Sequence, residues 1–132
     1  MQNLHLARTS FSPTIDFRFS EHTLTMSGEA YPEDANAFFH PILIALENYL
    51  KSIDGQTVEF NFRLTYFNSA ATKMLYSMFE LLNDSASTCN RIVLNWFHDE
   101  EDDTILEFGE GIQDDFKALD FQLIEVDLAA AA

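Results

Sequence analysis

Residues 57–82 read TVEFNFRLTYFNSAATKMLYSMFELL, and the rest of the chain is arranged around this stretch. From Val58 to Tyr66 apolar and polar residues alternate, which is the period of a strand with one buried face. The alternation stops at Asn68. Beyond it, apolar residues recur at helical spacing as far as Leu82. The stretch therefore predicts a strand followed directly by an amphipathic helix.

The junction between these two elements carries a candidate modification site. Asn68 and Ser69 are both good N-cap residues, because a short side-chain oxygen can accept a hydrogen bond from an amide of the first helical turn. A phosphoryl group on Ser69 would meet unpaired backbone N–H groups and the positive end of the helix dipole, with Lys73 within reach. The alternative is that Ser69 only caps the helix, a contribution of about 1 kcal/mol.

The helix that follows has two faces. The stripe predicted to lie in the core consists of Leu75, Met78 and Leu82. The second face follows spacings of three, four and three residues through Ser69, Thr72, Tyr76 and Phe79. Together with Asn68 and Lys73, we interpret this second face as a partner-binding surface. The alternative is that Tyr76 and Phe79 pack under a neighbouring loop.

Patterns elsewhere predict the remaining elements. They are, in chain order, a short strand at 3–7, a hairpin over 14–27, a helix from Asp34 or Asn36 to Ile53, a polar loop at 83–90, a strand at 91–97, a helix carrying Ile105, Phe108, Ile112 and Phe116, a strand at 121–126 and a frayed tail at 129–132. Pro41 should kink its helix or push the regular part later. Gly109 and Gly111 each cost roughly 1 kcal/mol relative to alanine, so the last helix should need tertiary support.

This order predicts one domain over residues 1–128, of α/β or α+β class, with a mixed sheet. The clean alternation of the central strand indicates that only one face of the sheet is covered, since a strand covered on both sides reads as a continuous apolar run. The helices are therefore expected to pack on one face.

Composition limits the classes of partner. Of 132 residues, 22 are acidic and 7 are basic, and the formal net charge of −15 opposes binding to nucleic acid or to anionic membranes. The single cysteine, Cys89, cannot form an internal disulfide, no apolar run is long enough to span a bilayer, and the first residues lack the features of a signal peptide. We expect a cytoplasmic protein.

An acidic segment precedes the last helix: Asp99, Glu100, Glu101, Asp102 and Asp103. Asp99, Glu101, Asp103 and Glu110 match a calcium-loop spacing, but threonine occupies the position that requires glycine, so no metal site is predicted. A solvated loop that contacts a basic partner is favoured. The alternative function is a small acidic metal- or ligand-binding domain, or an enzyme, that uses this cluster. No glycine-rich phosphate loop is present, and no cofactor is predicted.

Three segments together resemble a known family. They are Leu64–Lys73, Asn95–Asp103 with Glu107–Glu110 behind it, and Gly28–Glu33. They are similar to the SiaC family of bacterial regulatory phosphoproteins, and the resemblance spans nearly the whole chain. It implies a fold like the STAS domain of anti-sigma-factor antagonists, in which a phosphorylated serine or threonine also begins a helix after a strand.

The resemblance further implies a non-enzymatic partner-switching protein. A serine/threonine kinase would phosphorylate it, a PP2C-type phosphatase would reverse this, and the unmodified form would bind and activate a diguanylate cyclase in c-di-GMP signalling and biofilm control. The family's acceptor threonine, in an Asn-Thr-Ser-Ser pattern, matches Ser69. Here the tetrad is Asn68-Ser69-Ala70-Ala71, so Ser69 is its only hydroxyl.

Overall fold

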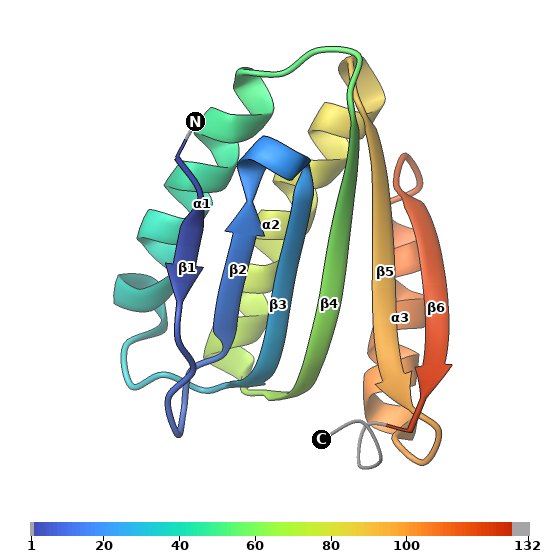
Figure 1. The fold of residues 1–132 in the computed structure, drawn as a ribbon. Helices are drawn as coiled ribbons and strands as arrows, with labels where there is room; N and C mark the ends of the chain where they lie inside the picture. The colour runs from blue at the N-terminus through green and yellow to red at the C-terminus, as the bar shows by residue number, and fades with distance from the viewer. Residues whose placement is uncertain (1, 128–132) are drawn as a thin grey trace.

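The structure, a computed structural model, describes residues 2–127, and the tail expected to fray at 129–132 lies outside this range (Figure 1). The elements follow in the order β1 (Leu4–Leu6), β2 (Thr14–Arg18), a 3-10 turn (Phe19–Glu21), β3 (Thr23–Ala30), α1 (Ala35–Lys51), β4 (Thr57–Phe67), α2 (Ser69–Thr88), β5 (Arg91–Asp99), α3 (Asp103–Asp115) and β6 (Asp120–Val126). No helix within the described range has the length and hydrophobicity needed to cross a membrane.

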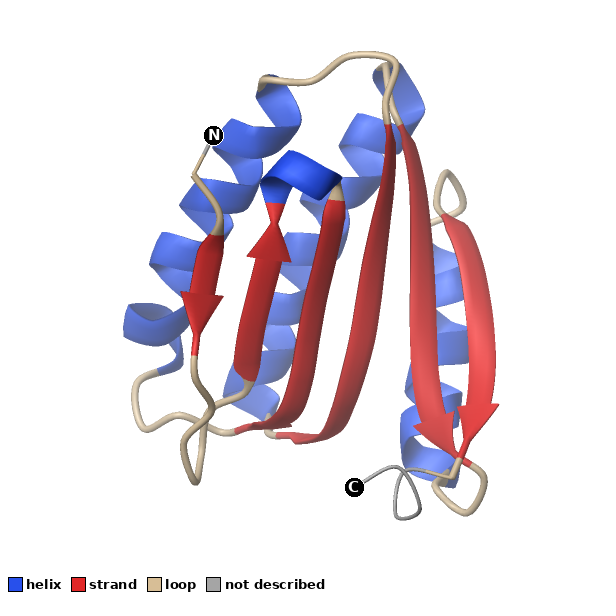
Figure 2. Cartoon of the chain, in the orientation of Figure 1, coloured by secondary structure: helices blue, strands red, loops and turns tan. Residues whose placement is uncertain are grey.

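The strands form one mixed sheet in sequence order, β1-β2-β3-β4-β5-β6. β1 and β2 pair antiparallel, as do β2 and β3, and the pairs from β3 onward are parallel. Each parallel connection passes through a helix, and α1, α2 and α3 all cover the same face (Figure 2). The predicted α/β class, with a mixed sheet and helices on one face, is confirmed.

The core lies between the sheet and the helices. On β4 the alternating residues Val58, Phe60, Phe62 and Leu64 are all buried, as the pattern predicts. On the open face, Asn95 of β5 donates hydrogen bonds to Glu59 Oε1 at 3.0 Å and to Asn61 Oδ1 at 2.9 Å. This polar network occupies the face that no helix covers.

Pro41 lies inside α1, which is regular from Ala35, so of the two predicted effects the delay of the regular part does not occur. Asp34 caps the helix by accepting a hydrogen bond from the Ala37 amide at 3.0 Å. Proline removes the bond to the carbonyl one turn earlier, which here belongs to Ala37. Both residues are exposed, so water can satisfy this carbonyl.

The polar loop expected at 83–90 is wrong, because α2 continues to Thr88. Ser87 Oγ donates to the Asn83 carbonyl at 2.8 Å and Thr88 Oγ1 donates to the Asp84 carbonyl at 3.0 Å, so these hydroxyls bond within the helix. Ser85 is buried, and its hydroxyl accepts from Asn90 Nδ2 at 3.1 Å. Burial of Ser85 and a tertiary contact, the bond from the Ala118 amide to Asn83 Oδ1 at 3.1 Å, offset the weak helix propensity of serine and asparagine.

Candidate phosphorylation and partner site

The site lies at the carboxyl-terminal ends of the parallel strands, where the helices begin (Figure 1). In open α/β sheets this is the edge where ligands usually bind. β4 ends at Phe67 and α2 begins at Ser69, so Asn68 alone joins the two elements. The junction is therefore held between the sheet and a long helix.

Asn68 is the cap of α2. Its Oδ1 accepts a hydrogen bond from the Ala71 amide at 2.9 Å, and its backbone is extended. Its own amide donates to the Ala30 carbonyl at 3.2 Å, and its carbonyl accepts from the Thr72 amide at 2.9 Å. The alternative interpretation, in which Ser69 serves only as the cap, is wrong, because Asn68 already does this.

Ser69 is the first residue of α2, and it is exposed. Within residues 2–127 its hydroxyl makes no hydrogen bond. The first amides of a helix have no carbonyl one turn earlier, and the Asn68 side chain satisfies only the amide of Ala71. The amides of Ser69 and Ala70 therefore remain free to donate hydrogen bonds to a phosphoryl group attached to Ser69 Oγ.

Lys73 is the cation nearest to this hydroxyl along the helix. It is exposed, and residues four apart share one face of a helix. No ion pair of Lys73 is found in the part of the chain that the structure describes. Its ammonium group is therefore available to a phosphoryl group on Ser69.

Phe79 does not belong to an exposed partner surface in this conformation, because it is completely buried. Its ring lies 5.0 Å from Phe62, 5.9 Å from Phe116 and 6.2 Å from Trp96, measured between centroids. The helical spacing correctly places Phe79 near Tyr76, but the sheet and Phe116, directly after α3, enclose it. The expectation that it contacts a partner is corrected here.

Tyr76 and Thr72 are half-buried. The Tyr76 ring packs against Phe108 of α3 at a centroid distance of 5.9 Å and against Phe116, which begins the loop after α3, at 6.0 Å. The alternative, in which Tyr76 and Phe79 pack under a neighbouring loop, therefore holds in part. Thr72 Oγ1 donates to the Asn68 carbonyl at 3.0 Å. The exposed part of the expected partner surface is therefore centred on Ser69 and Lys73.

The sequence pattern misplaces Tyr66, which alternation assigns to the buried face. Gly28 pairs with Leu64 and Glu29 pairs with Tyr66, so a β-bulge skips Thr65. A shift by one residue exchanges the two faces of a strand. Tyr66 is consequently 51% exposed. Its ring contacts that of Tyr31, also exposed, at a centroid distance of 5.6 Å.

An apolar cavity of 360 Å³ adjoins the junction. It lies between the end of β4, where Tyr66 and Phe67 line it, and the start of α3, where Ile105 and Phe108 line it. Sequence reasoning missed this cavity. The sequence signals nearby are the Tyr31-Pro32-Glu33 motif, the aromatic pair that ends β4 and the acidic segment, whose Asp102 lines the cavity. The end of β4, directly before the junction, therefore faces a mainly apolar cavity on the side of α3.

The acidic segment begins at Asp99, the last residue of β5, and continues through a loop into the first turn of α3. Asp102 caps α3 by accepting from the Ile105 amide at 3.0 Å, and Asp99 Oδ1 accepts from the Glu101 amide at 2.9 Å. Asp103 and Glu110 of the calcium-loop spacing are seven residues apart on this helix, about 10 Å along its axis. Among residues 2–127, no three His, Cys, Asp or Glu side chains are placed to hold a metal ion.

Comparison with known proteins gives a family and a fold. Residues 6–126 match the family described as SiaC family regulatory phosphoprotein. An uncharacterized protein of Pseudomonas aeruginosa (strain UCBPP-PA14) is 28% identical over 116 residues, which cover 87% of this chain and 90% of that protein.

Two solved structures are similar to the whole chain. SiaC of Pseudomonas aeruginosa matches with a TM-score of 0.87 and 24% identity, over 96% of this chain and 100% of its own. A chain in the crystal structure of the diguanylate cyclase SiaD in complex with its activator SiaC, from the same organism, matches with a TM-score of 0.87 and 24% identity, over 93% of this chain and 99% of its own. At this identity the likeness shows that the fold is shared.

Proposed function

The chain belongs to the SiaC family of regulatory phosphoproteins, and we propose that it is a switch whose output is set by reversible phosphorylation of Ser69. The family is one of regulatory proteins and not of enzymes, as the sequence suggests. A serine/threonine kinase transfers the γ-phosphoryl group of ATP to Ser69 Oγ, releasing ADP and a proton. A PP2C-type phosphatase hydrolyses the phosphoester and restores the hydroxyl.

One observation carries this proposal: the Ser69 hydroxyl is exposed and makes no structural hydrogen bond within the described residues, because Asn68 caps the helix. A kinase can therefore modify it without breaking the fold. After transfer, the amides of Ser69 and Ala70 and the ammonium group of Lys73 can bind the phosphate oxygens. The modified state is stabilised by groups already in place.

We further propose that the unmodified form binds and activates a diguanylate cyclase in the cytoplasm, and so acts in c-di-GMP signalling and biofilm control. The support is the solved complex of the cyclase SiaD with its activator SiaC, which shares this fold. The exposed ring of Tyr66 and the apolar cavity beside Phe67 offer an apolar contact area next to Ser69.

Phosphorylation should release this partner. A phosphoserine carries about −1.5 to −2 charges, and a protein seated on the junction would have to bury this charge against Tyr66 and Phe67. Burying a charge in an apolar contact is strongly unfavourable unless it is paired. Asp102, which lines the same cavity as Phe67, adds repulsion. Desolvation, steric overlap and like charge therefore all oppose binding of the phosphorylated form.

The first experiment maps the modified residue. The protein is incubated with ATP and a kinase encoded beside its gene, and phosphosites are identified by mass spectrometry. We expect one phosphoryl group, on Ser69, and none on the Ser69→Ala variant. Ser77→Ala is the matched control, because Ser77 lies further along α2 with its hydroxyl bonded to the Lys73 carbonyl at 3.3 Å. It should be phosphorylated like the wild type, and modification of Ser69→Ala would contradict the assignment.

The second experiment measures how phosphorylation changes binding and activation of the cyclase. Binding to a candidate cyclase and its c-di-GMP production are compared for the wild type, the phosphorylated protein, Ser69→Ala and Ser69→Asp. The unmodified protein and Ser69→Ala should bind and activate, while the phosphorylated protein and Ser69→Asp should bind about tenfold more weakly or worse. Equal affinity of the phosphorylated and unmodified forms would show that release is not the mechanism.

A further inference from the structure

A second surface lies away from the Ser69 junction, between α1 and α2. These helices run side by side in the same direction across the sheet (Figure 1). Two cavities of 310 and 340 Å³ lie along the line between them and share Glu47, Leu81 and Asp84 as walls. They form one groove, here called the α1/α2 groove. Along α1 it extends from His40 to Lys51, about 16 Å at the rise of a helix, and Ile53 lines it just beyond the end of α1.

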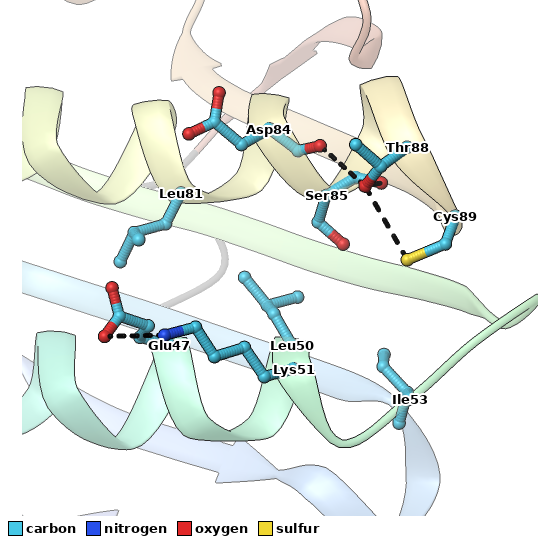
Figure 3. A pocket seen from close by; sticks show the side chains of 9 residues that line it. All are labelled: Glu47, Leu50, Lys51, Ile53, Leu81, Asp84, Ser85, Thr88 and Cys89. Carbon is cyan, nitrogen blue, oxygen red and sulfur yellow. Dashed lines mark hydrogen bonds and ion pairs between the residues drawn. The ribbon is translucent and has the colours of Figure 1, made fainter.

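The floor of the α1/α2 groove is apolar. Leu50 and Leu81 point into the space between the two helices, with Ile53 at one end (Figure 3). At the other end the lining includes Leu43 and Ile44. Ile44 is 47% exposed, although a side chain of this size is usually buried. An apolar floor that opens to water is typical of a surface that another molecule covers.

The rim of the groove is acidic. Glu47, Glu80 and Asp84 line it, and the one lysine on it, Lys51, is already paired with Glu47 at 3.5 Å. Neither Glu80 nor Asp84 forms an ion pair with any described residue. The groove therefore attracts cations at its edges while its floor attracts apolar side chains.

We infer that the α1/α2 groove binds an amphipathic helix of a partner protein, with an apolar stripe flanked by lysine or arginine. Its length along α1 fits about 11 residues of helix. A helix seated between two others reproduces the packing of helical bundles, and helix-in-groove recognition uses anchors spaced along one face. A second copy of this chain fits poorly, because each copy has a net charge of −15 and an acidic rim would meet an acidic surface.

This inference does not rest on the proposed switch. Ser69 begins α2 and Cys89 follows its end, so the Cys89 end of the groove lies about 30 Å from the junction along the helix axis. The groove begins at Ser77, two turns beyond Ser69. A helical partner can therefore bind in the groove whether or not Ser69 is phosphorylated.

The test uses a synthetic peptide of about 18 residues, made of leucine, lysine and alanine, with leucine at helical spacing and lysine on both flanks. Its binding to the full chain is followed by fluorescence anisotropy at about 0.15 M NaCl. A scrambled peptide of the same composition, without the apolar stripe, is the ligand control. We expect the patterned peptide to bind and the scrambled peptide to bind about tenfold more weakly or worse.

Matched protein variants separate the groove from general charge attraction. Glu80→Lys with Asp84→Lys reverses the rim, and Glu110→Lys with Asp114→Lys makes the same change at the same spacing on the exposed face of α3. The rim pair should lose about tenfold or more in affinity, and the α3 pair about twofold or less. Ile44→Asp should weaken binding, and Ser69→Asp should leave it unchanged. Circular dichroism checks that each variant is folded.

Cys89 supplies an independent readout, because it is exposed, lines one end of the groove and is the only cysteine of the sequence. The patterned peptide should slow its alkylation by iodoacetamide. Equal losses in the two charge-reversed pairs, equal binding of both peptides, or an unprotected Cys89 would overturn the inference. So would a wild-type dimer that Ile44→Asp dissociates, because the groove would then be an interface between two copies of this chain.

Discussion

Asn68 and Ser69, which are neighbours at the junction, have different roles. Asn68 holds the structure through its side chain and both of its backbone groups, whereas the hydroxyl of Ser69 makes no hydrogen bond within the described part of the chain. Both residue types are good caps, so the sequence leaves two assignments open. The observed hydrogen bond to the Ala71 amide selects Asn68, and this leaves Ser69 free for modification.

A stability measurement should separate these two tasks. Asn68→Ala removes the cap and should lower the free energy of unfolding by about 1 kcal/mol. Ser69→Ala should change it by about 0.5 kcal/mol or less, because no structural bond is lost. Urea unfolding of both variants beside the wild type gives the values. A larger loss for Ser69→Ala than for Asn68→Ala would mean that the serine has a structural task after all.

At the scale of the element, α3 is held against the sheet by Trp96. The indole Nε1 donates to the Ile105 carbonyl at 2.9 Å, and the ring stacks on Phe108 at a centroid distance of 5.6 Å. Gly109 allows this close approach, since a Cβ at this position would lie 2.5 Å from the indole Cδ1. Gly111 has nothing within 4 Å of such a Cβ. Of the two glycines that weaken the helix, only one is required by packing.

These two glycines should therefore respond in opposite directions to alanine. Gly109→Ala should lower the free energy of unfolding by about 1–3 kcal/mol, because α3 or Trp96 must move. Gly111→Ala should raise it by up to about 1 kcal/mol, through helix propensity alone. Urea unfolding followed by the fluorescence of Trp96, the only tryptophan, measures both. If Gly109→Ala were as stable as Gly111→Ala, the close packing of α3 on Trp96 would be disproved.

At the scale of the whole molecule, excess negative charge opposes folding. The chain has 22 acidic and 7 basic residues, and the four ion pairs among the described residues all involve an exposed Lys or Arg, so they contribute little. Mutual repulsion of the remaining carboxylates is greater in the compact state than in the unfolded chain. The free energy of unfolding should therefore depend on how strongly salt screens these charges.

Raising NaCl from about 0.02 to 0.2 M shortens the Debye length severalfold, and the free energy of unfolding should increase. Urea, which is uncharged, is the suitable denaturant. KCl should have the same effect as NaCl at equal concentration, because screening does not depend on the identity of the cation. A free energy of unfolding that stayed constant or fell with salt would show that repulsion between surface charges is not a significant cost.

Local patterns were sufficient to predict the order of the elements, the α/β class, the buried stripe of β4 and the position of the junction at Asn68 and Ser69. Periodicity and capping involve residues a few positions apart, so they can be recognised before any tertiary contact is known. The motifs around the junction and in the acidic segment also indicated the SiaC family, which the family match confirms.

The features that local patterns did not predict are determined by contacts between distant segments. Phe79 is buried because Phe116, directly after α3, and Phe62 of the sheet pack against it. Tyr66 faces outward because a bulge shifts its pairing with β3, and the last turns of α2 are held by distant contacts such as that between Asn83 and Ala118. The α1/α2 groove exists only where two helices meet. None of these features has a local signature, because each depends on which residues the fold brings together across tens of positions, and on the energy that their packing supplies.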